Sequence, residues 1–153
     1  MLNKPDNFIT MNMLSISDKY FDFLLKAGFK GPFEYNYVRE VHTDYIKGNI
    51  VIEIIYEGSF WVFVTKTKKY IPELEMGTKK IKDLDYSEYK SYDLFNLDPR
   101  RQLYNSVDFN NIDEKALWFF SRLLKDNPEI LNGNLKKFNI INYILKKTGL
   151  IKH

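Results

Sequence analysis

The stretch GNIVIEIIYEGSFWVFVTKT, residues 48–67, decides the fold, because two runs of β-branched and aromatic residues flank a short Glu-Gly-Ser segment. Residues of these types favour β-strands, and short glycine-containing turns between them favour hairpins. Gly48-Asn49 and Gly58-Ser59 each fit a two-residue hairpin loop with glycine first. Working outward, the sequence predicts an antiparallel meander with strands at about 34–46, 50–57 and 60–67, after a chain break at Gly31-Pro32.

The two loops also predict a register, since directly opposed residues share a face of the sheet. Asp44 then lies opposite Glu53. We expect one face to be apolar and covered by helices, with Ile52, Ile54, Tyr56, Trp61 and Phe63 as its members. The other face mixes carboxylates with apolar residues, and we expect it to hold Glu40, His42, Asp44, Glu53, Ile55, Glu57, Phe60 and Val62.

Helical patterns lie on both sides of this meander. A helix at about 17–27 is predicted by a serine cap, by its apolar spacing and by Gly28, which fits a left-handed cap. Two further helices are expected at about 113–127 and 135–147. Their expected inward residues are Leu117, Phe120, Leu123 and Leu124, and then Phe138, Ile141, Ile144 and Leu145. Between them and the meander, Asp98-Pro99 resembles a helix start.

These elements predict one α+β domain over residues 1–153, because 153 residues suffice for one core and no linker divides them. It would contain an N-terminal helix, a three- to four-stranded antiparallel meander and a helical C-terminal half. From 68 to 111 we expect a short strand or turn and then short helices.

Composition excludes several kinds of chemistry. The chain has no cysteine and two histidines, which excludes thiolate metal sites, cysteine nucleophiles and His-pair metal motifs. The seven glycines form no nucleotide-binding fingerprint. We therefore expect no cofactor, no metal and no catalytic residue. The first residues lack an apolar secretory core and no run reaches membrane-spanning length, so we expect a cytoplasmic protein.

Two sets of acidic residues could nevertheless take part in chemistry, one as metal ligands and the other in acid–base catalysis. Asp83, Asp85 and Glu88 could supply oxygen ligands to Ca²⁺ or Mg²⁺, but a solvated turn followed by a helix start explains them more simply. The Asp44–Glu53 pair could act as a general acid and base. Alternatively, it belongs to a solvent-facing surface with Lys47 and Lys66 as counter-ions, or to a protein-binding face.

Several basic residues suggest nucleic-acid binding as an alternative function. The net charge is only +3, from 23 basic and 20 acidic residues, which is less than generic phosphate binding usually shows. The cations concerned are scattered and interleaved with acids: Arg100, Arg101, Lys136, Lys137, Lys146 and Lys147. The alternative, a small nucleic-acid-associated or mobile-element regulatory protein, is therefore the weaker interpretation.

The segments YFDFLLKAGF (20–29) and YIKGNIVIEIIYEGSFWVFV (45–64) together resemble small bacterial immunity proteins of polymorphic or contact-dependent toxin systems. The resemblance covers about residues 17–67. It implies a cytosolic, non-catalytic protein that binds and neutralises one cognate toxin. The expected contact residues are Glu40, Asp44, Glu53, Glu57, Tyr86, Glu88 and Tyr89. Inhibitors of basic nuclease toxins are often acidic, so the slightly basic chain fits such a partner only if its acids are concentrated locally.

Overall fold

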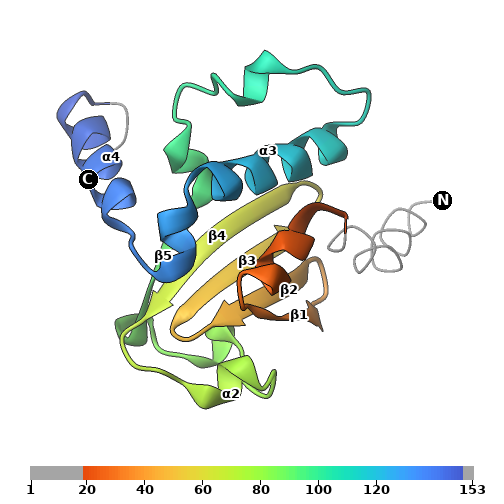
Figure 1. The fold of residues 1–153 in the computed structure, drawn as a ribbon, viewed down its shortest axis with the longest axis vertical. Coiled ribbons are helices and arrows are strands. Elements are labelled where there is room, and N and C mark those ends of the chain that lie inside the picture. Colours follow the sequence, from red (N-terminus) through yellow and green to blue (C-terminus); the bar gives the residue numbers. More distant parts are fainter. Residues whose placement is uncertain (1–18, 150–153) are drawn as a thin grey trace.

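The computed structural model describes residues 19–149 of the chain. Its centre is a five-stranded antiparallel sheet in which each strand pairs with the next one along the sequence (Figure 1). The strands are β1 (Lys30–Asn36), β2 (Val41–Lys47), β3 (Ile50–Tyr56), β4 (Phe60–Thr67) and β5 (Tyr89–Asp93). Residues 19–26 are helical, and the two long helices after the sheet are α3 (Ile112–Asp126) and α4 (Lys136–Lys147). The predicted α+β class is confirmed.

The hairpin between β2 and β3 has the predicted register. Lys47 pairs with Ile50, so the loop is the two-residue turn Gly48-Asn49, and Asp44 pairs with Glu53. Gly48 has a φ of 60°, a left-handed conformation that glycine adopts without steric cost. A tight turn with glycine first thus fixes which residues of the two strands share a face.

The predicted register of β3 and β4 is wrong by one residue. Tyr56 pairs with Phe60, so Glu57, Gly58 and Ser59 form a three-residue loop, closed by a hydrogen bond from the Glu57 N–H to the Ser59 carbonyl. A one-residue slip moves every side chain of a strand to the other face. The core face of β4 is therefore Phe60, Val62 and Val64. Trp61 and Phe63 lie on the reverse face, on the same side of the sheet as Glu53.

The strand predicted at 34–46 is two strands. Residues 37–40 form a turn between β1 and β2, closed by the Tyr37 N–H donating to the Glu40 carbonyl at 2.9 Å. No glycine or proline marks this turn in the sequence. Gly31 and Pro32 do not precede the sheet as expected; they lie inside β1, where the pairing with β2 is irregular between Lys30 and Phe33. The extra strand and β5 bring the sheet to five strands, against the three or four predicted.

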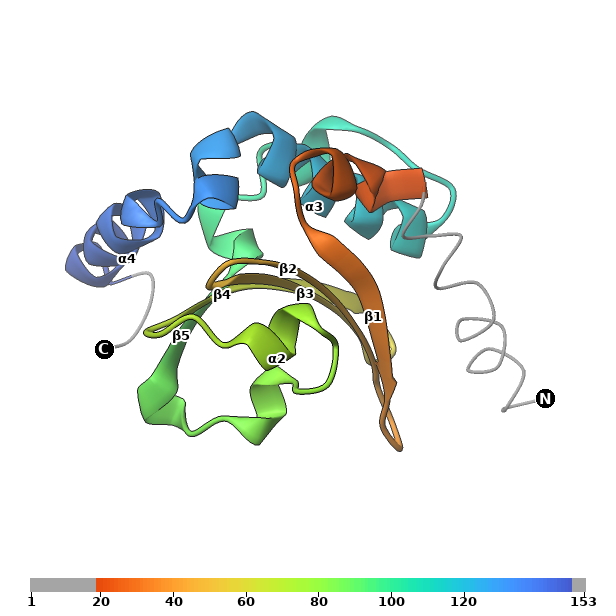
Figure 2. The same cartoon turned by 60° about the horizontal axis from the view of Figure 1, so that its bottom comes forward.

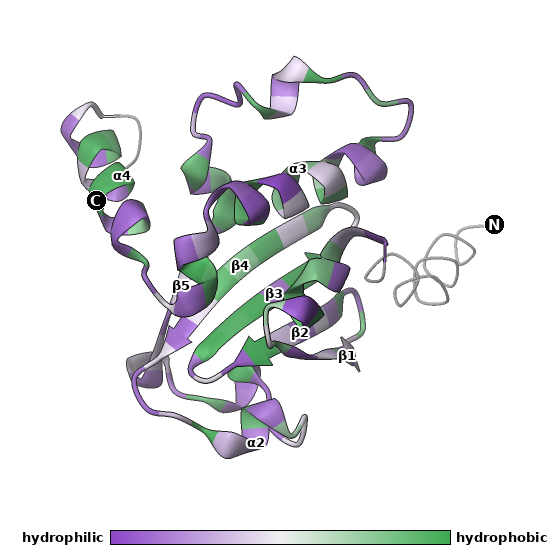
Figure 3. Cartoon of the chain, in the orientation of Figure 1, coloured by the Kyte–Doolittle hydropathy of each residue, from purple (hydrophilic) through white to green (hydrophobic). Residues whose placement is uncertain are grey.

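The main core lies between the sheet and the helices. Figure 3 shows hydrophobic residues concentrated along β3 and β4, and the 19–26 helix and α3 cover this face. The helices supply Phe21, Leu24, Leu117, Phe119, Phe120, Leu123, Leu124 and Phe138. Asn111 caps α3, because its side-chain oxygen accepts the N–H groups of Asp113 and Glu114. The predicted helices at 113–127 and 135–147 are confirmed to within one residue at each end.

The last helix is less buried than predicted. Phe138 and Leu145 of α4 are buried, but Ile144, expected to point inward, is 51% exposed. Helix α4 projects beyond the edge of the sheet beside β5 (Figure 1), so only part of its apolar face meets the core. Gly28, in contrast, has the predicted left-handed conformation, with a φ of 97° after the helical residues 19–26.

Residues 68–88 cover part of the reverse face. They form short elements, namely α2 (Pro72–Glu75), η1 (Ile81–Asp83) and η2 (Tyr86–Glu88), on the side of the sheet opposite α3 (Figure 2). Their residues Leu74, Ile81 and Leu84 pack on Ile46 and Val51 in a second, smaller core. The sheet is thus enclosed by helices on one face and by this irregular segment on part of the other.

The segment after β5 is mostly irregular. It contains the short 3₁₀ turns η3 (Leu94–Leu97) and η4 (Tyr104–Ser106), and η5 (Pro128–Asn132) links α3 to α4. Asp98 does not start a regular helix as predicted. Instead, its buried carboxylate accepts the N–H groups of Gln102, Leu103 and Tyr104 at 2.9–3.2 Å. The residue therefore organises a loop through N–H groups further along the chain than those of Arg100 and Arg101, which it would have capped at a helix start.

Candidate functional site

The border between the covered and the open part of the reverse face is marked by a buried carboxyl pair. Asp44 of β2 and Glu53 of β3 are cross-strand partners, and they are only 2% and 8% exposed. The sequence predicted their pairing, but the interpretation as a solvent-facing surface is wrong. The segment 68–88 packs on the same face, and for this reason the two carboxyl groups lie in the interior.

The two carboxyl groups differ in their hydrogen bonds. Glu53 Oε1 accepts a hydrogen bond from Thr65 Oγ1 at 3.0 Å, and Thr65 Oγ1 lies 2.6 Å from Ser91 Oγ. Among the described residues, Asp44 Oδ1 has no hydrogen-bond partner. Burial raises the pKa of both groups, and the neighbouring Glu53 raises that of Asp44 further. Asp44 therefore retains its proton to a higher pH than an exposed aspartate does.

A second polar cluster lies beside this pair. His42 Nε2 lies 3.0 Å from Glu40 Oε1, and Lys82 Nζ donates to the same oxygen at 3.1 Å. Partial burial alone would raise the pKa of Glu40, but hydrogen bonds with Glu57, His42 and Lys82 lower it to about 2. Burial lowers the pKa of His42 despite its acidic neighbour. Lys82 also lies 3.9 Å from the centre of the Tyr37 ring. Glu40 is therefore ionised, and Lys82 is its counter-ion.

Lys47 and Lys66 do not serve as the predicted counter-ions of the reverse face. Lys47 Nζ donates to the Ala27 carbonyl at 2.8 Å, and Lys66 Nζ donates to the Gly133 carbonyl at 3.0 Å. Both contacts lie on the helical side of the sheet. Lys82, which comes from the segment that covers the reverse face, provides the positive charge instead.

The open part of the reverse face forms a groove of about 390 Å³, which we call the acidic groove. Its lining residues are Glu40, Ile55, Glu57, Trp61, Phe63 and Asp93. Trp61 is 37% exposed, and its ring packs edge-on against Phe95 at a centroid distance of 6.0 Å. Three apolar side chains thus lie among three carboxyl groups. The groove combines an apolar contact surface with acidic groups that favour a cationic partner.

The carboxyl groups of the groove are not equivalent. The hydrogen bond with Glu40 and the negative charge of Glu40 raise the pKa of Glu57. A proton on Glu57 both donates to Glu40 and removes the repulsion between the two carboxylates. Burial raises the pKa of Asp93, although its side chain also accepts the Phe95 N–H. A cation entering the groove would favour the charged form of each of these groups.

The predicted contact residues separate into three groups in the structure. Glu40 and Glu57 line the acidic groove, whereas Asp44 and Glu53 are buried and do not form part of the accessible surface. Their burial also keeps them from a substrate in solution, which argues against the general acid–base interpretation. The other three predicted residues, Tyr86, Glu88 and Tyr89, belong to η2 and the start of β5 and do not line the groove.

Sequence reasoning did not select Trp61, Phe63 and Asp93 as contact residues. The missing signal was the length of the β3–β4 loop, because a three-residue loop turns Trp61 and Phe63 to the reverse face. Asp93 belongs to β5, where it pairs with Phe63. A strand prediction at 89–93 would have brought this third carboxylate to the same groove.

The acidic cluster considered for a metal has local structural roles. Asp83 Oδ2 accepts the Lys80 N–H at 3.1 Å, and the Asp85 N–H donates to Glu88 Oε1 at 3.4 Å, so each pair closes a 3₁₀ turn. Across the described residues 19–149, no group of three or more His, Asp or Glu side chains is placed to hold a metal ion.

The cations considered for nucleic-acid binding differ in their contacts. The Arg101 guanidinium lies over the Phe95 ring at 3.9 Å, and Lys137 forms an ion pair with Glu129 at 3.1 Å. Lys146 and Lys147 are exposed in the last turn of α4. Of the six, Lys136 lines a cleft between β4, β5 and the start of α4.

Within the part of the chain that the structure describes, no helix is long and apolar enough to cross a membrane. Comparisons with models of protein families, with curated proteins and with solved structures found no match to this chain.

Proposed function

We propose that this protein is a non-catalytic immunity protein that acts in the cytoplasm, where it binds a cognate bacterial toxin through the acidic groove and neutralises it. The observation that carries the proposal is the half-exposed Trp61, which lies beside Phe63 and Ile55 and among three carboxyl groups. Tryptophan residues in such surroundings are frequent anchors of protein interfaces. The partner segment that fits this groove is basic, with an apolar side chain to contact Trp61.

The charge of the groove supports a basic partner even though the chain as a whole is slightly basic. The net charge is +3, yet Glu40, Glu57 and Asp93 converge on one groove. Lys82 already pairs with Glu40, so Glu57 and Asp93 are the carboxyl groups with the most capacity for a new cation. Local charge of this kind increases the association rate and rejects acidic partners.

The gene neighbourhood and a rescue assay test this proposal. The upstream gene should encode a large protein with a variable C-terminal toxin domain, and co-expression of the present chain should rescue cells from that domain. An isolated gene with no such neighbour contradicts the proposal, and so does a toxin domain that kills equally with and without the chain.

A matched pair of charge reversals tests the groove itself. Glu57→Lys changes an exposed carboxylate in the groove, and Glu73→Lys makes the same change in an exposed residue of α2 that does not line it. We expect Glu57→Lys to abolish rescue, since it would repel a basic segment, and Glu73→Lys to preserve it. Equal rescue by the two variants would exclude the acidic groove as the contact surface.

A further inference from the structure

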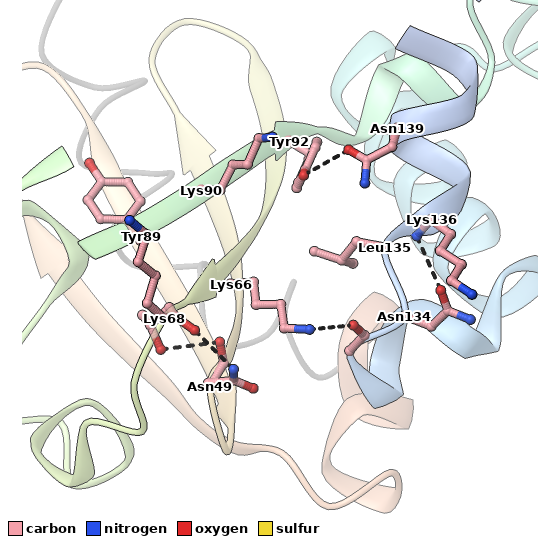
Figure 4. A pocket seen from close by; sticks show the side chains of 12 residues that line it. Asn49, Lys66, Lys68, Tyr89, Lys90, Tyr92, Asn134, Leu135, Lys136 and Asn139 are labelled. Atoms are coloured by element: carbon pink, nitrogen blue, oxygen red, sulfur yellow. Dashed lines mark hydrogen bonds between the residues drawn. The ribbon is translucent and has the colours of Figure 1, made fainter. Parts of the chain in front are cut away.

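A second cleft lies on the other side of the sheet, where the core face runs out between β4, β5 and the start of α4 (Figure 4). Its volume is about 620 Å³. We call it the lysine cleft, because four lysines line it: Lys66, Lys68, Lys90 and Lys136. No carboxylate occurs among the described residues that line it. Its remaining polar groups are mainly tyrosine and asparagine side chains.

The strongest sign of an anionic ligand is a pair of lysines in direct opposition. Lys66 of β4 and Lys90 of β5 are cross-strand partners, which places two positive charges on neighbouring strands. Like charges in this position destabilise a sheet. Lys68 comes directly after the end of β4 and lines the same cleft. An anion bound between these lysines would attract both of them and so offset their mutual repulsion.

The floor and the far wall of the cleft are held in place by hydrogen bonds. Lys66 Nζ donates to the Gly133 carbonyl, which joins β4 to the end of η5. Tyr92 OH donates to Asn139 Oδ1 at 3.1 Å (Figure 4). The Tyr92 ring also stacks on Phe138, with the ring centroids 4.9 Å apart. These contacts tie the sheet to α4. Lys68 and Lys90, in contrast, are exposed at the cleft and are the cations with most freedom to meet a ligand.

We propose that the lysine cleft binds a small ligand that carries at least two linked phosphate groups. Four lysines can neutralise a multiply charged anion, and ammonium groups bind phosphate through charge-assisted hydrogen bonds. The volume lies within the usual range for small-molecule sites, roughly 300–1,000 Å³. The ligand is either a free polyphosphate or the phosphate chain of a nucleotide. This site is separate from the acidic groove and does not depend on the toxin-binding proposal.

Isothermal titration of the full chain with inorganic tripolyphosphate and with ATP tests the proposal. We expect one equivalent of tripolyphosphate to bind, with an affinity that falls as salt is added. ATP binding with similar affinity assigns the site to the phosphate chain, and ATP binding more tightly assigns it to a nucleotide. Absence of binding by both probes would overturn the proposal. Binding only to a single-stranded oligonucleotide would also overturn it, in favour of an extended nucleic-acid surface.

A matched pair of variants locates the binding. K68Q/K90Q removes two charges at the cleft and leaves the contact of Lys66 with Gly133 intact, whereas K146Q/K147Q removes two exposed charges from the last turn of α4. We expect K68Q/K90Q to weaken tripolyphosphate binding by about tenfold or more. K146Q/K147Q should change it less than about twofold, since screening reduces distant charges. Equal losses of tripolyphosphate affinity in both variants would show that the binding comes from general charge attraction and would overturn the proposal. Toxin rescue should persist in K68Q/K90Q, which separates this proposal from the previous one.

Discussion

Asp44 and Glu53 are directly opposed across β2 and β3, and both carboxyl groups are buried between the sheet and the segment that covers its reverse face. Two buried acids side by side disfavour double ionisation, because each negative charge loses hydration and repels the other. Thr65 provides a hydrogen bond to Glu53, while Asp44 Oδ1 is unpartnered among the described residues. At neutral pH this pair therefore destabilises the fold.

The pair predicts a specific dependence of stability on pH. A carboxyl group whose pKa is raised by folding binds its proton more tightly in the folded state than in the unfolded state. Its stabilising contribution is complete below the unfolded pKa, about 3.9 for Asp, and is lost as the pH rises through the folded pKa. Asp44→Asn removes the ionisation and should increase the free energy of unfolding near pH 8 by about 1 kcal/mol or more. Urea denaturation near pH 3.5, below the unfolded pKa, and near pH 8 measures the difference. A variant less stable than the wild type near pH 8 would contradict it.

Gly31 should tolerate substitution poorly. It has a φ of 127°, and a Cβ there would lie 2.6 Å from the Asp44 carbonyl oxygen. Gly31→Ala should lower the free energy of unfolding by roughly 3 kcal/mol, because backbone strain is added to a clash with backbone that cannot move aside.

Gly58→Ala provides the control for Gly31→Ala. Gly58 also has a positive φ, of 80°, but nothing lies within 4 Å of a Cβ at that position. Gly58→Ala should lower the free energy of unfolding by only about 1 kcal/mol, which is the cost of a left-handed conformation for alanine. Chemical denaturation of both variants provides the comparison, and equal losses would show that the close approach of β1 to Asp44 is not tight.

The loop after β5 should depend on Asp98. Its buried carboxylate accepts three backbone N–H groups, and a side chain without oxygen leaves those donors unsatisfied. Asp98→Ala should lower the free energy of unfolding by about 2–3 kcal/mol, whereas Asp108→Ala, at an exposed position in the same region, should change it by less than about 0.5 kcal/mol. Thermal unfolding distinguishes the two. A small effect at Asp98 would mean that water replaces the carboxylate.

The register of β4 can be checked by stability as well. Val62 is fully buried on the core face, while Trp61 is partly exposed on the reverse face. Val62→Ala should lower the free energy of unfolding by about 1–2 kcal/mol, through the lost apolar contacts and the cavity left behind. The register first predicted from the sequence would place Trp61 in the core and Val62 outside. A neutral effect of Val62→Ala would therefore favour that register over the observed one.

The sequence was sufficient to predict the elements with strong local signals. Gly48-Asn49 specified both the β2–β3 loop and the Asp44–Glu53 pairing. The apolar spacing of Leu117, Phe120 and Leu124 predicted α3 and its buried face. In each case the residues that determine the element lie close together in the chain, so local preferences and tertiary packing agree.

The features that escaped prediction depend on contacts between distant segments. The Glu-Gly-Ser segment fits a two-residue or a three-residue loop, and only packing of Val62 and Val64 in the core selects the latter. The cover of the reverse face depends on Leu74 and Ile81, which lie in an irregular segment without a helical or strand-like period. The sequence therefore identified Glu40 and Glu57 as contact residues. It did not identify Trp61, because the face on which Trp61 lies depends on the length of the β3–β4 loop.

The most direct test of the toxin-binding proposal is the affinity of the neighbouring gene's toxin domain for two aromatic variants, measured by isothermal titration. Trp61→Ala removes the proposed anchor, whereas Tyr143→Ala removes an exposed aromatic ring from α4, outside the groove. We predict that Trp61→Ala weakens toxin binding by about 2 kcal/mol or more, and that Tyr143→Ala binds the toxin as tightly as the wild type does. Equal affinities of Trp61→Ala and the wild type would contradict the assignment of the acidic groove as the toxin-binding surface.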